Sequence, residues 1–206
     1  MSKVDFKKEL SHLYRPSSKD LAIVDVPPMN FLMIDGRGDP NVEPAYEDVV
    51  EALYGVAYAV KFASKGMGRD YVVPPLEGLW WADDMDVFPR EDKDAWQWTM
   101  MVMQPDWISE AMVEEAREGV AEKKDAPMLS ELRFEPYHEG LSVQIMHLGP
   151  YDAEGPTIAR MHAFIADNDY EPAGKHHEIY LSDPRRAKPE NLKTVLRQPV
   201  RRVNMT

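Results

Sequence analysis

The sequence predicts an α+β fold of two tandem modules, each with the order strand, helix, strand, strand, related by a pseudo-two-fold axis around a central ligand cleft. Short segments in which apolar and polar residues alternate indicate strands. Two longer segments carry apolar residues at helical spacing instead. The same order of segments, with a Gly/Pro turn before the helix, occurs in both halves of the chain. Because one half alone would bury little core, we expect the halves to pack as a pair.

Composition limits the class of protein and its partners. The chain has 206 residues, 44% of them hydrophobic, and a formal net charge of −12, so its mean field repels nucleic-acid phosphates. It contains no cysteine, which excludes disulfides, thiolate metal sites and cysteine nucleophiles. The N-terminus lacks the apolar core of a signal peptide, and no run is long enough to cross a bilayer. We therefore expect a cytoplasmic protein with no nucleic-acid and no membrane partner.

The first half is expected to comprise a lead-in segment over residues 1–20 and a module with its connector helix over residues 21–125. Its predicted elements are strands over 21–26 and 30–35, a helix over 44–65, short strands over 71–73 and 76–81, a charged loop over 83–94, a strand over 95–103 and the connector helix over 109–122. Pro27 and Pro28 interrupt the first strand, because proline cannot donate to a central ladder. The long helix carries an apolar stripe that includes Val49, Leu53 and Val60.

The second module is expected over residues 126–206. Its predicted elements are strands over 131–136 and 141–148, a helix over 154–165, a short strand beginning at residue 176 and a last strand over 192–200. Gly149 and Pro150 form the turn before the helix, as Gly36 does in the first module.

The strand that begins at residue 176 carries a candidate functional acid, Glu178. Alternation puts Glu178 and Tyr180 on one face of this strand and Ile179 on the other. If the polar face meets solvent, the strand is an ordinary amphipathic one. If that face lines an aromatic cavity, Glu178 is a desolvated acid with a raised pKa. Glu77 stands near the start of the matching strand, and two-fold packing would bring both carboxylates to opposite sides of one cleft.

Four motifs carry a resemblance to a known family. They are HEIYLSDPRR at 177–186, LKTVLRQPV at 192–200, PPLEGLWW at 74–81 and HLGPY at 147–151. With these motifs the chain resembles the GyrI-like small-molecule-binding proteins, especially their stand-alone bacterial subfamily. It is also similar to the effector-binding domain of multidrug-responsive transcription regulators. Those regulators join that domain to a helix-turn-helix, and we expect no such segment before residue 20 or after residue 200.

The resemblance implies two strand-helix-strand-strand modules around a ligand cleft, and it implies that some stand-alone members hydrolyse the strained cyclopropane of DNA-alkylating natural products. Such a reaction needs a base for the attacking water and a donor for the carbonyl oxygen that gains charge. Glu178 is the first candidate for the base and Glu77 the second. Tyr137 and Tyr151 are candidate donors. The reaction requires neither a metal nor a cofactor.

Aromatic side chains on or beside the strands suit a flat organic ligand. The candidate ligand-binding residues are Trp81, Trp98, Trp96, Tyr71, Tyr180 and His177. A single Trp on a strand is more often part of a core than of a ligand wall. Adjacent His176 and His177 point to opposite faces of a strand, so they do not share an ion easily and no metal site is predicted.

Other functions remain open at this level. A non-catalytic protein that sequesters or senses cationic drugs would use the same acidic, aromatic cleft, with cation–π contacts to its ligand. A gyrase-inhibitor-like interaction protein is a third alternative. The sequence leaves undecided whether the protein is an enzyme, and whether it is a monomer or a homodimer.

Overall fold

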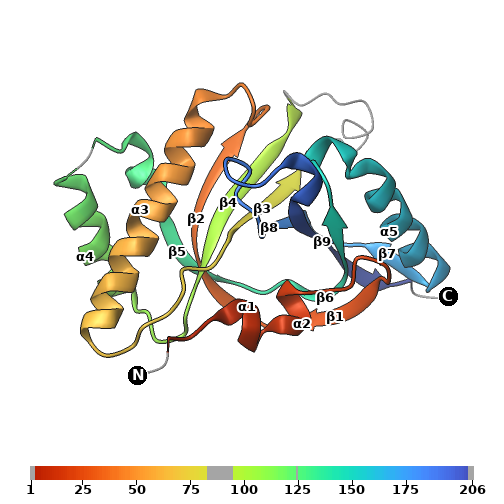
Figure 1. The fold of residues 1–206 in the computed structure, drawn as a ribbon, viewed down its shortest axis with the longest axis horizontal. Helices are drawn as coiled ribbons and strands as arrows, with labels where there is room; N and C mark the ends of the chain where they lie inside the picture. Colours follow the sequence, from red (N-terminus) through yellow and green to blue (C-terminus); the bar gives the residue numbers. More distant parts are fainter. Residues whose placement is uncertain (1–2, 83–94, 124, 204–206) are drawn as a thin grey trace. The chain divides into compact units, whose positions relative to one another are not determined.

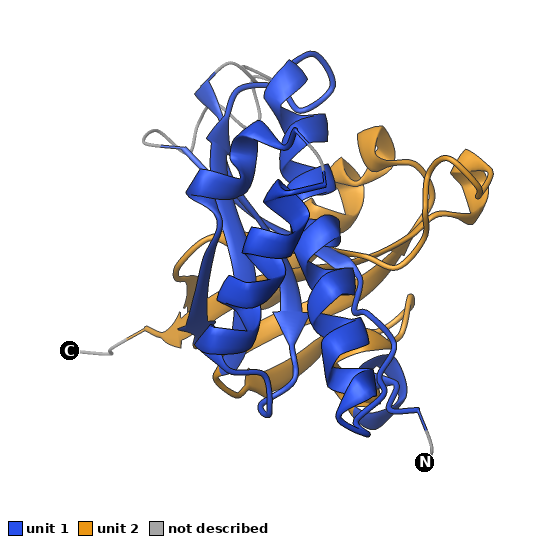
Figure 2. Ribbon diagram, turned by 90° about the vertical axis from the view of Figure 1, so that its left-hand side faces the viewer, with its two compact units in different colours: residues 1–9, 29–137 blue, residues 10–28, 138–206 orange. Residues whose placement is uncertain are grey.

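The computed structural model describes residues 3–82, 95–123 and 125–203, and the chain divides into two compact units (Figure 2). Unit 1 comprises Met1–Glu9 and Met29–Tyr137, and unit 2 comprises Leu10–Pro28 and His138–Thr206. Each unit combines an antiparallel sheet with helices, so the predicted α+β class is confirmed. The charged loop predicted over 83–94 lies outside the described residues. Within the described part of the chain, no helix is both long enough and apolar enough to span a membrane.

Unit 1 contains a four-stranded sheet in the order β5-β2-β4-β3 (Figure 1). Its elements are α1 (Phe6–Glu9), β2 (Met29–Arg37), α3 (Pro44–Gly66), β3 (Leu76–Trp81), β4 (Gln97–Gln104), α4 (Glu110–Ala121), the 3₁₀ helix η3 (Pro127–Glu131) and β5 (Arg133–Tyr137). Helix α3 packs on β2 and β4, and α4 and η3 pack on α3.

The long helix α3 forms where the apolar stripe predicted it. Pro44 stands in its first turn, where the missing N–H has no intrahelical partner in any case. Val49, Leu53 and Val60 are fully buried against the sheet. The burial of this face, rather than helix propensity alone, stabilises the helix.

Unit 2 contains a sheet in the order β1-β6-β9-β8, with β7 added to β9. Its elements are α2 (Ser11–Tyr14), β1 (Ala22–Val26), β6 (Gly140–Leu148), the 3₁₀ helix η4 (Tyr151–Ala153), α5 (Gly155–Asp167), β7 (Tyr170–Pro172), β8 (His176–Tyr180), the 3₁₀ helix η5 (Pro189–Asn191) and β9 (Lys193–Arg202). Met161 and Ile165 of α5 pack in one apolar cluster with Ile145 of β6 and Leu196 of β9. Helix α5 therefore covers the face of the sheet that carries Leu196.

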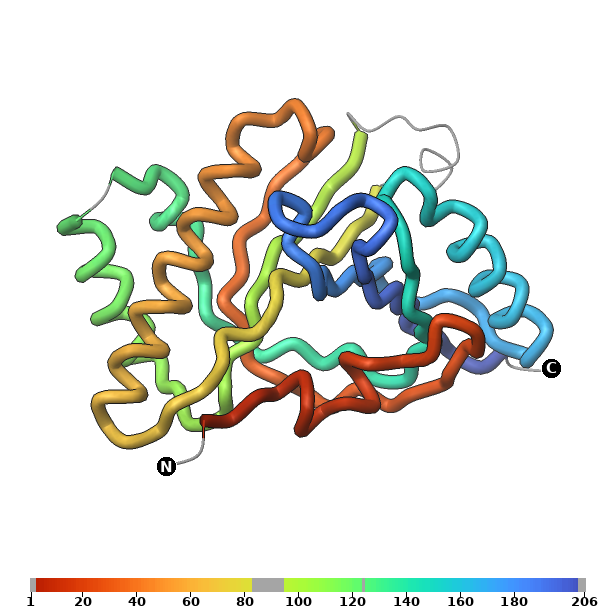
Figure 3. The backbone as a smooth tube through the Cα atoms, in the orientation of Figure 1, coloured from red at the N-terminus to blue at the C-terminus, as the bar shows by residue number. Residues whose placement is uncertain are grey.

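The two units repeat one arrangement of strands. In unit 1 the strands pair in the order β5-β2-β4-β3, and in unit 2 the strands β1-β6-β9-β8 occupy the same places, so that β5 corresponds to β1 and β2 to β6. The edge strands are exchanged along the sequence, since β1 of unit 2 leads directly into β2 of unit 1 and β5 of unit 1 leads into β6 of unit 2 (Figure 3). Pro27 and Pro28 separate β1 from β2, as predicted.

Three local features differ from the prediction. The strand predicted over 71–73 is a single bridge between Tyr71 and Val4, and β7 forms where a loop was expected. The lead-in segment is more ordered than its weak apolar pattern indicates. Leu13 and Tyr14 are buried, because the Arg197 guanidinium donates to the Leu13 carbonyl at 2.8 Å.

Candidate active site in unit 2

Strand β8 presents its polar side chains to α5. Glu178 is paired across the ladder with Leu196, which belongs to the apolar cluster under α5. Side chains that are directly opposite in a ladder project to the same face. Glu178 and Tyr180 therefore lie on the α5 side of the sheet, while His177 and Ile179 lie on the other side. The alternation predicted from the sequence is confirmed.

A second carboxylate, Glu154, meets Glu178 on this face. Glu154 is the residue immediately before α5, its side chain makes no capping hydrogen bond, and only 5% of it is exposed. The negative charge of Glu178 and the burial of both side chains favour the protonated form of Glu154, and the two groups are electrostatically coupled. Two buried carboxylates that are close to each other cannot both be ionised at low cost, so the pair holds a proton.

Burial is the main cause of the unusual acidity of this pair. Desolvation, together with the negative charge of Glu178, raises the pKa of Glu154 from 4.5 to about 9. Desolvation also raises the pKa of Glu178 from 4.5 to about 7, and hydrogen bonding to Tyr180 opposes this increase. At neutral pH the pair therefore retains a proton that an isolated exposed carboxyl would have released, which is a condition for acid–base work.

Two tyrosines complete the site. The Tyr180 hydroxyl donates to Glu178 Oε2 at 2.8 Å. Tyr151 of η4 packs edge-on against the Tyr180 ring, with 5.6 Å between ring centroids. Desolvation raises the pKa of Tyr151 to about 12, so its hydroxyl remains a donor at physiological pH. A donor of this kind can stabilise an oxygen that gains charge during a reaction.

The floor of the site is a row of side chains across three strands. Tyr180 of β8 pairs with Thr194 of β9, which pairs with His147 of β6. The Thr194 hydroxyl favours the ionised form of Glu154. Yet Thr194 Oγ1 and Glu154 Oε1, both buried, have no hydrogen-bond partner of good geometry among the described residues. One oxygen belongs to the carboxyl pair and the other to its neighbour Thr194, and both keep hydrogen-bonding capacity.

His176 does not act as a counter-ion to the pair. Its Nε2 lies 3.7 Å from Glu178 Oε1. Burial lowers the pKa of His176 to about 4, so the imidazole is neutral when Glu178 ionises. His176 therefore supplies no positive charge to Glu178, whereas the charge of His177 lowers the pKa of Glu178.

The opposite face of β8 holds a buried ion cluster. His177 Nδ1 lies 3.0 Å from both Glu139 oxygens, and Arg197 Nη1 donates to Glu139 Oε2 at 2.9 Å. Burial alone would raise the pKa of Glu139, but His177 and Arg197 lower it to about 2. This cluster accounts for the position of His177, whose predicted contact with a ligand stays a prediction.

The remaining predicted site residues belong to unit 1. Glu77 is fully buried in β3. Trp98 is also buried; it packs edge-on against Tyr46 and donates from Nε1 to the Gly38 carbonyl at 3.2 Å. The Tyr71 hydroxyl donates to the Gln104 side chain at 3.1 Å. The ring of Tyr137 packs edge-on against Phe31, and that of Trp96 packs edge-on against Trp80. Trp81 is half-buried in β3. Each has a local packing partner or position in its own sheet, and their predicted roles stay predictions.

Glu77 and Glu178 are not equivalent within their own units. Trp98 contacts Tyr46 of α3, so Trp80, its ladder partner, lies on the α3 side of the sheet. Glu77 is three residues from Trp80 and therefore points to the face away from α3. Glu178 points toward its own helix. The two acids therefore differ in side-chain direction relative to the helix of their own unit, and their predicted positions on opposite sides of one cleft stay a prediction.

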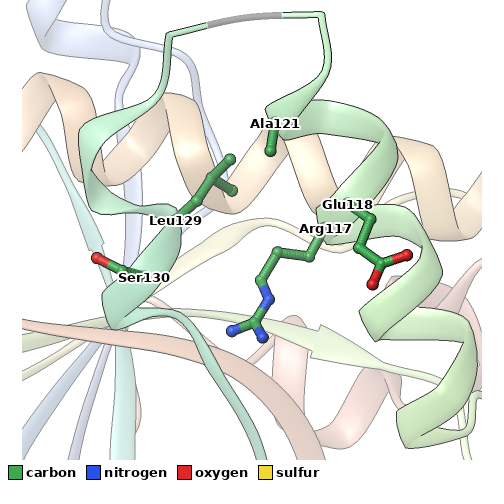
Figure 4. A pocket seen from close by; sticks show the side chains of 5 residues that line it. All are labelled: Arg117, Glu118, Ala121, Leu129 and Ser130. Atoms are coloured by element: carbon green, nitrogen blue, oxygen red, sulfur yellow. The ribbon is translucent and has the colours of Figure 1, made fainter.

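Two hollows occur in unit 1, and neither is lined by the carboxyl pair. One, of about 380 Å³, lies between α4 and η3 and is bordered by Arg117, Ala121 and Leu129 (Figure 4). The other, of about 340 Å³, is bordered by Asp35, Trp98 and six further residues. Among the predicted site residues only Trp98 borders either hollow.

Within residues 3–82, 95–123 and 125–203, no group of three or more His, Asp or Glu side chains is arranged to hold an ion.

Sequence reasoning identified Glu178, Tyr180 and Tyr151, but it missed Glu154. An acid just before a helix is typical of an exposed first turn, so the pattern carried no signal of burial.

Comparison with known proteins identifies the class. The chain matches the GyrI-like small molecule binding domain over residues 19–201 and belongs to the GyrI-like family. A crystal structure of a conserved protein from Listeria innocua is similar, with 44% identity and a TM-score of 0.90 over 97% of this chain and 100% of that chain. A hydrolase from Listeria innocua has 43% identity and a TM-score of 0.83 over the same shares.

More distant structures share only the fold. The C-terminal domain of EcmrR has 12% identity and a TM-score of 0.57 over 89% of this chain and 98% of that domain. None of the curated proteins matches the chain. The protein is thus a GyrI-like small-molecule-binding domain with a buried carboxyl pair in unit 2.

Proposed function

We propose that the Glu154–Glu178 pair is the catalytic centre of a cofactor-independent hydrolase, which adds water to an activated cyclopropane in hydrophobic xenobiotics and so detoxifies them. The observation that carries the proposal is the buried pair itself, which holds a proton and has tyrosine hydroxyls beside it. A domain that only binds a neutral aromatic ligand has no need of two desolvated carboxyls in contact. The similarity to a Listeria innocua hydrolase also supports the proposal.

The reaction assigns a separate role to each carboxyl. Ionised Glu178 accepts a proton from water as the water oxygen bonds to a cyclopropane carbon. The carbon–carbon bond of the ring breaks, and its electron pair moves into the conjugated dienone, whose oxygen becomes a phenolate. Protonated Glu154 or the Tyr151 hydroxyl then supplies a proton to that oxygen. One water is consumed, the product is an alcohol and a phenol, and no oxidant or reductant takes part.

The Tyr180 hydroxyl holds Glu178 in its ionised form and orients it. A hydrogen bond to the charged form of an acid lowers its pKa. Without this donor, burial would keep Glu178 protonated and unable to accept a proton at neutral pH. Tyr180 is thus a positioning residue for the base, and Tyr151 covers it edge-on.

Incubating the purified protein with a spirocyclopropyl cyclohexadienone in ¹⁸O-labelled water tests the proposal. The expected product is the ring-opened alcohol, heavier than the substrate by one labelled water. Glu178→Gln and Glu154→Gln are each expected to lower kcat by about 10² to 10⁴, the usual contribution of general acid–base catalysis. Glu190→Gln, on exposed η5, is the matched control and should retain activity.

Two outcomes would contradict the proposal in different ways. Saturable quenching of tryptophan fluorescence with the substrate recovered unchanged would indicate a binding protein that sequesters its ligand. Full activity of Glu178→Gln together with an inactive Glu77→Gln would move the catalytic centre to the other predicted acid.

A further inference from the structure

Helix α3 carries an aromatic stripe on its exposed face. The stripe is defined by Tyr54, Tyr58 and Phe62, which follow one another at intervals of four residues. Tyr58 and Phe62 are 50% and 60% exposed. Their rings contact along the helix, with centroid separations of 6.2 Å for Tyr54–Tyr58 and 6.5 Å for Tyr58–Phe62. Aromatic side chains gathered on a surface are typical of a protein interface.

This stripe lies opposite the face with which α3 packs on its sheet. At 3.6 residues per turn, Tyr54 and Phe62 lie within about 40° of Tyr58 around the helix axis. Val49 and Val56 project about 160–180° away from Tyr58 on the same reckoning, and both are fully buried. The core of unit 1 therefore accounts for the buried face of α3 but not for the exposed rings of Tyr58 and Phe62.

The charges that flank the stripe have opposite signs at its two ends. Glu47 and Glu51 extend it toward the start of α3, and Lys65 extends it toward the end. All three are exposed. The arrangement is palindromic about Tyr58: Tyr54 and Phe62 stand four residues on either side, and Glu51 and Lys65 stand seven residues on either side.

We propose that the aromatic stripe of α3 binds the same stripe of a second copy of this chain, with the two helices antiparallel and related by a two-fold axis at Tyr58. In that arrangement each Tyr54 contacts the second copy's Phe62, and each Glu51 faces the second copy's Lys65. A two-fold interface must be self-complementary, and a surface that is palindromic in both shape and charge meets that condition. An unrelated partner would require no such symmetry.

The size of the surface sets the expected strength. Helix α3 has 23 residues, which corresponds to a length of about 34 Å. One helix face of this length is smaller than the roughly 800 Å² per partner of a standard interface. The dimer should therefore be weak and should form as the protein concentration rises. The inference is independent of the proposed catalysis, since none of its residues belongs to the carboxyl pair.

Sedimentation equilibrium from about 5 µM to about 500 µM tests the association. The wild-type chain is expected to pass from monomer to dimer over this range. Tyr58→Glu puts two like charges on the two-fold axis and should raise the dimer dissociation constant at least about tenfold. Val42→Glu, at a 73% exposed site outside α3, is the control and should leave it unchanged. A wild-type chain that stays monomeric throughout would overturn the proposal and indicate a different protein as the occupant.

Two further variants test the geometry. Glu51→Lys and Lys65→Glu should each weaken the dimer, and the double variant should restore it, because the exchanged charges face each other again. Since the chain has no cysteine, Tyr58→Cys supplies a single thiol at the axis, where packed helices bring the two Cα atoms to about 4–5 Å, within disulfide reach. Rapid oxidation to a covalent dimer, with Val42→Cys remaining monomeric, supports the axis; equal rates for both variants would refute it.

Discussion

The substitution Glu154→Gln should make the protein more stable at alkaline pH. Burial raises the pKa of Glu154 from 4.5 to about 9, so the folded chain keeps a proton that the unfolded chain releases above pH 4.5. Where the folded state binds more protons, stability falls as pH rises. At about 1.4 kcal/mol per pKa unit, the three units between pH 5 and pH 8 correspond to an upper limit of about 4 kcal/mol. Glutamine has no such proton and avoids this loss.

Urea unfolding of the wild-type and variant proteins at pH 5 and pH 8 measures the effect. The comparison uses the difference between the two proteins at each pH, so that contributions from titrating groups distant from Glu154 cancel. From pH 5 to pH 8, the free energy of unfolding of Glu154→Gln should rise relative to that of the wild type by about 2–4 kcal/mol, which is about half to all of this limit. Glu190→Gln should show no gain. A Glu154→Gln difference that is the same at both pH values would refute the buried, proton-holding pair.

Three further substitutions test the packing and electrostatics around the site. Tyr180→Phe removes the donor to Glu178, so the acidic limb of the pH–rate profile should move to higher pH. Glu139→Gln removes the anion from a buried ion cluster and should lower the free energy of unfolding by about 3–5 kcal/mol in thermal or urea denaturation. Gly36→Ala would place a Cβ 2.0 Å from the Trp98 ring and should destabilise unit 1, which near-ultraviolet circular dichroism of Trp98 would report.

The elements of the fold were predictable because their periods are local. The apolar stripe of α3, which includes Val49, Leu53 and Val60, and the alternation in β8 are visible in short windows of sequence, and both are confirmed. The exchange of edge strands was not visible. Ala22 of β1 pairs with Gln144 of β6, and no local pattern specifies a partner so distant in the chain. Loop closure and competition among edges decide such pairings.

The site was predictable only in part. The sequence pattern made Glu178 a candidate, because an acid on a half-buried strand needs a partner or a function. Its partner Glu154 comes from the start of a helix, and only tertiary packing places that helix start over the strand. His177 lies on the opposite face of β8 from Glu178, beside Glu139, and its predicted contact with a ligand stays a prediction. Side-chain direction, rather than residue type, separates His177 from the carboxyl pair.

The pH dependence of kcat/KM for ring opening is the most direct test of the catalytic pair. With Glu178 as base and Glu154 as acid, kcat/KM should rise through about pH 7 and fall through about pH 9. The alkaline limb should disappear, at reduced rate, in Glu154→Gln. A profile that is flat from pH 5.5 to pH 9.5 in the wild-type protein would contradict the assignment of the reaction to this pair.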